Sequence, residues 1–199
     1  MAPKFGTSGL RGLVTELTAE LVADYTRAFL AACPHGGAVH VGRDLRPSSP
    51  EIAAVVIDTV AAEGLDVVDC GVVPTPALAL SSMGAGNAAI MVTGSHIPAD
   101  RNGLKFYVPG GEIAKADEEA ISGNLGRAPA EVSRGAVTDG GEAAAGYAAR
   151  YASAFGPGAL AGLRIGVYQH SSVARDTMME VVTALGGEPV ALARSETFI

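Results

Sequence analysis

The sequence contains no tryptophan and only two cysteines, Cys33 and Cys70. These cysteines fit no metal-ligand spacing and no disulfide framework, so we expect two small buried groups in a reducing compartment such as the cytoplasm. The chain does not open with a basic segment followed by an apolar core, and we therefore expect no secretory signal.

Positive charge is also scarce, because 14 Lys and Arg residues stand against 21 Asp and Glu, giving a formal net charge of −7. Nucleic acid and anionic membrane surfaces require a basic face, so we expect neither as a partner. If the ligand is an anion, its cationic contacts must be concentrated in one cleft. With 48% hydrophobic and 18% charged residues, the 199-residue chain is expected to form a sizeable core.

One long segment, from Cys70 to Ala99, contains no Asp, Glu, Lys or Arg. A membrane span would require an uninterrupted apolar run, but Pro74, Pro76, Gly84 and Gly86 break this segment. We therefore interpret it as buried core elements rather than a transmembrane helix.

Hydrophobic periodicity and turn residues predict alternating strands and helices, and hence an α/β fold. Thr18, Ser49 and Thr75 are expected helix N-caps, the last two being followed by proline. The helices are expected near 21–32, 50–63, 77–83 and 116–125, and the strands near 38–41, 67–68, 88–92 and 104–108. Asn102-Gly103 predicts a tight reversal that pairs the last two strands in antiparallel fashion. The predicted architecture is a three-layer α/β/α domain with a mixed sheet, although the pattern does not settle which other strands are parallel.

Gly156-Pro157-Gly158 predicts a domain boundary, so we divide the chain into residues 1–157 and residues 158–199. After the boundary, strand, helix and strand patterns at 163–168, 173–185 and 189–193 predict the start of a second similar α/β domain. His170 beside Ser171 and Ser172 invites a catalytic interpretation, but helix capping explains these residues at least as well.

Chemistry is expected at the end of the apolar run Ala88–Val92, where Ser95 and His96 follow in a small polar turn. Open α/β sheets bind ligands at the carboxyl ends of their strands. Lys105 returns on the next extended segment and brings a cation toward the hydroxyl. The alternative is that Ser95 and His96 only satisfy local backbone groups in the turn.

Two further segments hold arginine beside glycine or aspartate. In Gly6-Thr7-Ser8-Gly9-Leu10-Arg11-Gly12, the glycines allow close backbone approach to a ligand, and Arg11 offers a planar fork suited to phosphate. A flexible N-terminal turn is the alternative. Arg43 and Asp44 are expected either to form a structural ion pair or to contact a ligand.

These motifs together resemble the α-D-phosphohexomutases, a superfamily of phosphomannomutases, phosphoglucomutases and phosphoglucosamine mutases. The resemblance rests on four motifs in order: Gly-Thr-Ser-Gly-x-Arg-Gly at 6–12, Val-Gly-Arg-Asp-x-Arg-x-Ser-Ser at 41–49, Gly-x-x-Pro-Thr-Pro at 71–76, and Thr-Gly-Ser-His-x-Pro at 93–98 with Lys105 downstream. It covers the family's first domain and the start of a second. The full family chain has four domains, so the resemblance implies that this chain is an N-terminal fragment, by itself inactive.

The resemblance implies phosphoryl relocation between the 1- and 6-positions of a hexose. Ser95 would carry the phosphoryl group, Arg11 and Lys105 would offset negative charge, and His96 would orient the serine or move a proton. Mg²⁺ would bind through the phosphate on Ser95, and a hexose 1,6-bisphosphate would act as intermediate and activator. No Asp-Gly-Asp cluster occurs here, so the metal's carboxylate ligands are expected outside this chain. The expected partner is a small phosphosugar, and the oligomeric state is open.

Ile97 departs from the family pattern, which commonly has asparagine after the histidine. Thr-Gly-Ser-His-Ile-Pro with Lys-Phe-Tyr resembles bacterial phosphomannomutases more than the other members. Three alternatives remain: phosphoglucomutase or phosphoglucosamine mutase specificity, a non-catalytic phosphosugar- or anion-binding module, and a serine hydrolase. For the hydrolase, Ser95 lacks the Gly-x-Ser-x-Gly elbow.

Overall fold

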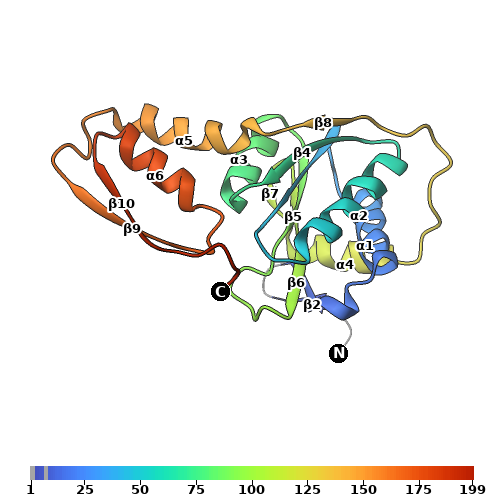
Figure 1. The fold of residues 1–199 in the computed structure, drawn as a ribbon. Helices are drawn as coiled ribbons and strands as arrows, with labels where there is room; N and C mark the ends of the chain where they lie inside the picture. Colours follow the sequence, from blue (N-terminus) through green and yellow to red (C-terminus); the bar gives the residue numbers. More distant parts are fainter. Residues whose placement is uncertain (1–2, 7–8) are drawn as a thin grey trace.

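The computed structural model describes residues 3–6 and 9–199 as a large α/β body with a smaller strand–helix–strand unit beside it (Figure 1). The strands of the large body are β1 (Lys4–Phe5), β2 (Leu10–Leu13), β3 (Ala38–Arg43), β4 (Asp66–Val72), β5 (Ala88–Val92), β6 (Arg101–Val108), β7 (Gly111–Glu112) and β8 (Val137–Asp139). Its helices are η1 (Val14–Glu16), α1 (Ala19–Ala32), α2 (Ser49–Ala62), α3 (Thr75–Gly84), α4 (Lys115–Gly123) and α5 (Glu142–Phe155). The smaller unit consists of β9 (Arg164–His170), α6 (Arg175–Ala184) and β10 (Glu188–Arg194).

The main sheet is mixed, as the sequence predicted. Its order is β1-β2-β6-β5-β3-β4-β8, and the short strand β7 pairs with the carboxyl end of β6. Strand β3 is parallel to both of its neighbours, β4 and β5, whereas β6 runs antiparallel to β5 and to β2. The carboxyl ends of β3 and β5 therefore meet at one edge of the sheet, where the antiparallel strand β6 begins.

Helices cover both faces of this sheet, which makes it the middle of three layers. Alternate residues of β5 show the division: Ile90 and Val92 pack with α1, α2 and α4, whereas Ala89 and Met91 pack with α3 and α5. All five residues of β5 are buried. A strand covered on both faces reads as a continuous apolar run, which is why this segment carries no charge.

The expected helix starts lie within two residues of the observed ones. Thr18 caps α1 as expected, and its hydroxyl accepts a hydrogen bond from the amide of Leu21. The other two caps differ: Ser48, not Ser49, is the N-cap of α2, and Pro74, not Thr75, is the N-cap of α3. Ser49 lies in the first turn of α2 because its hydroxyl donates to Asp44 at 2.6 Å instead of capping its own helix.

The prediction of a tight reversal at Asn102-Gly103 was wrong, although the antiparallel pairing of the flanking strands is confirmed. Both residues lie inside β6, opposite Gly12 and Arg11 of β2. The reversal is made by the longer segment 93–100. Asn102 is fully buried, and its side-chain amide donates to Ser48 and Ser49, so a long-range contact prevails over the local turn preference.

The smaller unit has its own two-stranded parallel sheet, β9 with β10, and α6 packs against both strands. Helix α5 contacts α3 of the large body and α6 of the smaller unit, so it bridges the two (Figure 1). A domain division at residue 158 remains a prediction.

Cys33 and Cys70 are free and buried, as the sequence indicated. Among the residues that the structure describes, no helix is long and apolar enough to cross a membrane.

Candidate active site

The candidate site lies where β3 and β5 end side by side. The amide of Asp44, just after β3, donates to the carbonyl of Val92 at the end of β5, at 3.0 Å. The chain then continues from Val92 through the segment 93–100, which we call the Ser95 loop, into β6. Neighbouring carboxyl ends of parallel strands are the common ligand-binding edge of an open α/β sheet.

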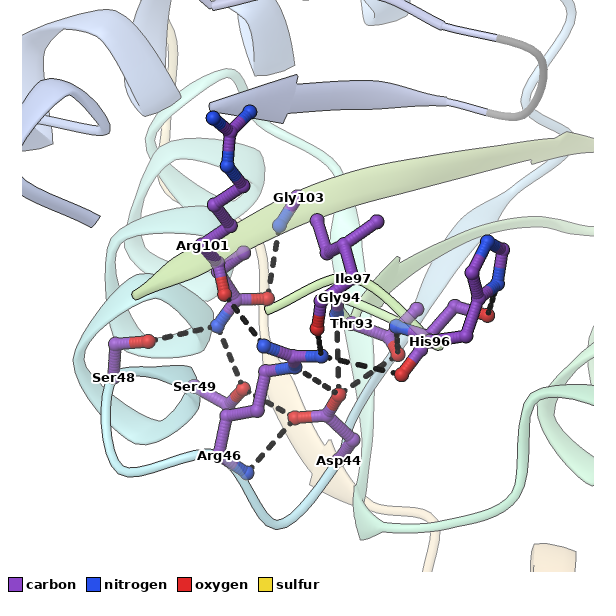
Figure 2. A network of polar contacts seen from close by, with 12 residues as sticks. Asp44, Arg46, Ser48, Ser49, Thr93, Gly94, His96, Ile97, Arg101 and Gly103 are labelled. Carbon is purple, nitrogen blue, oxygen red and sulfur yellow. Dashed lines mark hydrogen bonds and ion pairs between the residues drawn. The ribbon is translucent and has the colours of Figure 1, made fainter. Parts of the chain in front are cut away.

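Asp44 organises the start of the Ser95 loop (Figure 2). One carboxylate oxygen accepts hydrogen bonds from the Thr93 hydroxyl at 2.8 Å and the Gly94 amide at 3.2 Å. The other oxygen accepts from the Arg46 amide and the Ser49 hydroxyl. A buried carboxylate with four donors is well solvated by the protein, and it ties the two strand ends to the start of α2.

Arg46 lies beneath the Ser95 loop and is 1% exposed. One terminal nitrogen donates to the carbonyls of Pro98 and Arg101, and the other to those of Ser95 and Ile97, at 2.6–3.2 Å. Its Nε lies 3.5 Å from the Asp44 carboxylate. Burial lowers the pKa of Arg46, and the nearby Arg11 charge acts in the same direction, while Asp44 opposes the shift.

The sequence left open whether Arg43 and Asp44 form an ion pair or contact a ligand; in the described residues Asp44 pairs with Arg46. Arg43 ends β3 in an extended conformation, and Asp44 lies beyond the strand. Arg46 lies in the segment 41–49 that resembles the family, but its position in the sequence did not predict this role. A signal was available, since an arginine two residues after an aspartate, in a short loop at a strand end, is a natural partner for that aspartate.

Ser95 has a backbone φ of 50°, in the left-handed region that L-residues rarely occupy. Hydrogen bonds on both sides hold this conformation: the Ser95 amide donates to the Thr93 hydroxyl at 2.9 Å, and the Ser95 carbonyl accepts from Arg46. The Ser95 side chain is exposed, and its hydroxyl lies 3.3 Å from Nδ1 of His96. A strained residue held by its surroundings is a frequent feature of functional sites.

A cavity of about 610 Å³ opens beside Ser95 and His96. One wall is the Ser95 loop together with Asp44, Leu45 and Arg46. The opposite wall comes from the smaller unit, in two segments: residues 170–173 at the end of β9, and Phe198 with Ile199. The serine and histidine that the sequence singled out thus face a space large enough for a sugar phosphate.

His170, for which the sequence left a catalytic role and helix capping open, lines this opposite wall. Its carbonyl accepts from Arg175, and its ring nitrogen lies 3.4 Å from the Ser171 hydroxyl. The Ser172 hydroxyl accepts from the amide of Ala174, the N-cap of α6, so local capping contacts are present in this segment.

The remaining two expected site residues, Arg11 and Lys105, lie on neighbouring strands β2 and β6. Arg11 pairs with Gly103, and a Cβ at Gly103 would lie 3.3 Å from Arg11 Cγ, so the arginine stem crosses the glycine. Lys105 Nζ pairs with Glu112 at 3.0 Å. Burial alone would lower the pKa of Lys105, but hydrogen bonds to Glu112 and Tyr107 outweigh it and the pKa is raised. Neither residue lines the cavity, in contrast to Ser95 and His96.

Within residues 3–6 and 9–199, no group of three or more His, Cys, Asp and Glu side chains is arranged to hold a metal ion. The Asp44 carboxylate, beside the Ser95 loop, already accepts four hydrogen bonds and pairs with Arg46.

Comparison with known proteins agrees with the fold and identifies the family. The family model "Phosphoglucomutase/phosphomannomutase, alpha/beta/alpha domain I" matches residues 2–131, so this chain belongs to the phosphoglucomutase/phosphomannomutase family. The resemblance to the phosphohexomutases that the sequence motifs indicated is confirmed.

Individual relatives point in the same direction. A phosphomannomutase of Sinorhizobium fredii is 49% identical over the whole chain, and one of Salmonella muenchen is 44% identical over 98% of it. A phosphoglucosamine mutase of Parafrankia is 33% identical over 96%. The crystal structure of a phosphoglucomutase/phosphomannomutase family protein from Burkholderia thailandensis superposes with a TM-score of 0.76 at 28% identity, covering 94% of this chain and 43% of that one.

The chain spans less than half the length of these relatives. It covers 44% of the Sinorhizobium fredii protein, 41% of the Salmonella muenchen protein and 48% of the Parafrankia protein.

Proposed function

We propose that this chain is the phosphoryl-carrying portion of a phosphohexomutase, with phosphomannomutase as its specificity. The observation that carries the proposal is the exposed Ser95 hydroxyl, held in a left-handed conformation at the edge of a cavity of about 610 Å³. Membership of the family and the two phosphomannomutase relatives support the choice of reaction.

The reaction that we propose exchanges a phosphoryl group between Ser95 and the sugar. Phosphorylated Ser95 gives its phosphoryl group to the free 6-hydroxyl of a hexose 1-phosphate: the new O–P bond forms on the sugar, the Oγ–P bond breaks, and the hydroxyl proton is transferred to the serine side. The resulting hexose 1,6-bisphosphate turns around. Ser95 Oγ then takes the 1-phosphoryl group and the sugar 1-oxygen regains a proton, which leaves a hexose 6-phosphate.

His96 is the side chain placed to exchange that proton, because its Nδ1 lies 3.3 Å from Ser95 Oγ. Arg11 and Lys105 supply positive charge on adjacent strands and would offset the charge of the transferring group. A serine hydrolase is less well supported, since the nearby carboxylate, Asp44, is engaged with Thr93 and Gly94 and does not orient the imidazole.

Mg²⁺ would supply further neutralisation of phosphate charge. We propose that it binds through the Ser95 phosphate to carboxylates outside this chain. The smaller unit supports the idea that more of the protein is needed, because apolar residues on β9 and β10, Tyr168 and Leu192, are 63% and 46% exposed. The isolated 199 residues would then lack mutase activity.

The buried free thiols are consistent with a cytoplasmic location, which we also propose.

Covalent labelling tests this proposal. The full-length protein and its Ser95→Ala variant are incubated with a hexose 1,6-bisphosphate carrying labelled phosphate, and peptides are analysed by mass. We expect label on a Ser95 peptide of the wild type and none in the variant. The control is Ser171→Ala, which removes a hydroxyl from the opposite wall and should leave Ser95 labelled.

Two outcomes would contradict the mutase. Saturable binding of the bisphosphate without any label on the protein would indicate a non-catalytic phosphosugar-binding module. Equal labelling of the wild type and Ser95→Ala would show that another residue carries the phosphoryl group. Turnover of mannose phosphates compared with glucose and glucosamine phosphates decides the specificity.

A further inference from the structure

Arg46 makes more contacts than its ion pair with Asp44 requires. Its two terminal nitrogens donate four hydrogen bonds, to the backbone carbonyls of Ser95, Ile97, Pro98 and Arg101. Figure 2 shows the guanidinium directed at the loop, with its contacts to Ile97 and Arg101. A planar fork of fixed geometry can satisfy several carbonyls at once, whereas an ammonium is a point charge with three donors.

Close packing fixes the guanidinium against the loop. A Cβ on Gly94 would overlap Arg46 Cζ and Nε, so the backbone at residue 94 lies directly on the guanidinium. Asp44 holds the same group from the other side through Nε, and it also accepts from the Gly94 amide. The segment from Gly94 to Arg101 is thereby bound to one buried side chain.

The face of the guanidinium makes a second contact, with the smaller unit. Arg46 Cζ lies 4.6 Å from the centroid of the Phe198 ring. The segment that carries Phe198 is fixed to that unit, because the Ile199 amide donates to the Ser171 hydroxyl at 3.0 Å and Arg175 donates to the Ser195 carbonyl at 2.6 Å. The same guanidinium thus touches the Ser95 loop with its edge and the opposite wall of the cavity with its face.

We infer that Arg46 is a positioning residue for Ser95, and that Phe198 couples the Ser95 loop to the smaller unit through it. Arg46 donates to the Ser95 carbonyl and so holds the left-handed backbone that presents Oγ to the cavity. When Phe198 covers the guanidinium, water is kept from the four hydrogen bonds and the loop stays in this conformation. Arg46 touches no reacting atom, and its role in phosphoryl transfer rests on the proposed function.

Hydrogen exchange tests the positioning directly and without any assumption about activity. Arg46→Lys keeps the charge beside Asp44 but cannot reach four carbonyls. We expect amides of residues 95–101 to exchange about 10-fold faster or more, the effect of losing charge-assisted hydrogen bonds, while α1 is unchanged. The control is Arg134→Lys, because Arg134 is 52% exposed and pairs with a surface carboxylate, Asp58. Unchanged exchange at 95–101 overturns the inference.

Phe198→Leu tests the coupling and remains informative if Arg46→Lys fails to fold. Leucine preserves an apolar side chain but removes the ring face, so exchange at 95–101 should rise about 2- to 5-fold, in the range of a cation–π contact. Exchange that rises equally throughout the chain in this variant would show that Phe198 only stabilises the fold, and would overturn the coupling.

Kinetics of the full-length protein separate positioning from general structural support. In Arg46→Lys the rate of Ser95 labelling and kcat should fall about 10-fold or more, while KM stays within about 3-fold, because the loop and not the substrate contacts is altered. Equal losses in kcat and in affinity would contradict a positioning role. If the wild type takes no label at all, the proposed function fails, and the exchange data alone then decide whether Arg46 holds the loop.

Discussion

The Thr93 hydroxyl links Asp44 to Ser95: it donates to the Asp44 carboxylate at 2.8 Å and accepts from the Ser95 amide at 2.9 Å. A buried carboxylate at the end of β3 therefore fixes the backbone of an exposed serine beyond the end of β5. Such a connection allows the serine to be held in a strained conformation without being buried itself.

Replacement of Asp44 by asparagine should destabilise the protein. The asparagine amide lacks the negative charge that pairs with Arg46. Its NH₂ group also replaces a carboxylate oxygen that accepts hydrogen bonds, so two donors would face each other. We expect the free energy of unfolding to fall by about 3 kcal/mol, as for a broken buried ion pair. Urea unfolding measures this loss. Asp58→Asn is the control, because Asp58 is 71% exposed and its pair with Arg134 should contribute less than about 1 kcal/mol.

Gly94→Ala should displace the Ser95 loop, because the added methyl group overlaps the Arg46 guanidinium. Overpacking of this kind costs about 1–3 kcal/mol. The matched control is Gly146→Ala in α5, where a Cβ meets nothing within 4 Å. The control should be neutral or more stable by about 0.5–1 kcal/mol, since alanine favours a helix. Equal thermal midpoints for Gly94→Ala and the wild type would show that Arg46 can move away freely.

Arg11→Ala and Lys105→Ala should each lower turnover of the full-length protein by about 10²-fold, the usual effect of removing one electrostatic stabiliser. Folding should change little. Lys115→Ala is the control, because Lys115 is 75% exposed and pairs with Glu118 away from the cavity. Since the pKa of Lys105 is raised, its charge should be constant around neutral pH. Turnover close to that of the wild type in both variants would remove the two residues from the site.

His40 should make stability depend on pH. It is 5% exposed, and burial lowers its pKa from the ordinary value of 6.5. The groups that face its ring are neutral: Ser81, Asn87 and Cys70, whose thiol has its pKa raised to about 11 by burial. Because the unfolded chain binds the proton more readily, the free energy of unfolding should decrease as pH falls below 6.5.

Unfolding midpoints at pH 7 and pH 5 for the wild type, His40→Gln and His35→Gln test this effect. His40→Gln should show a smaller pH dependence than the wild type, whereas His35→Gln should follow the wild type, because the contact of His35 with the Gly36 carbonyl is local and exposed. A pH dependence that is unchanged in His40→Gln would assign the effect to other groups.

Local patterns in the sequence determined much of the fold. The uncharged run from Cys70 to Ala99 predicted buried elements, and it contains the fully buried strand β5. Thr18 predicted the start of α1, and the alternation of strands and helices predicted a sheet with helices on both faces. These features were accessible because periodicity and capping depend on residues only a few positions apart.

Only the tertiary structure decided the partners of the polar residues around Ser95. Arg46 donates to carbonyls 49–55 positions away. The same side chain, and not that of Arg43, forms the ion pair with Asp44. Asn102 lies in β6 instead of the expected turn, and its side-chain amide donates to the hydroxyls of Ser48 and Ser49. The second wall of the cavity comes from residues beyond 169. Buried polar groups take whichever partner the packed sheet brings within reach, and desolvation makes that partner obligatory, so sequence spacing alone does not reveal it.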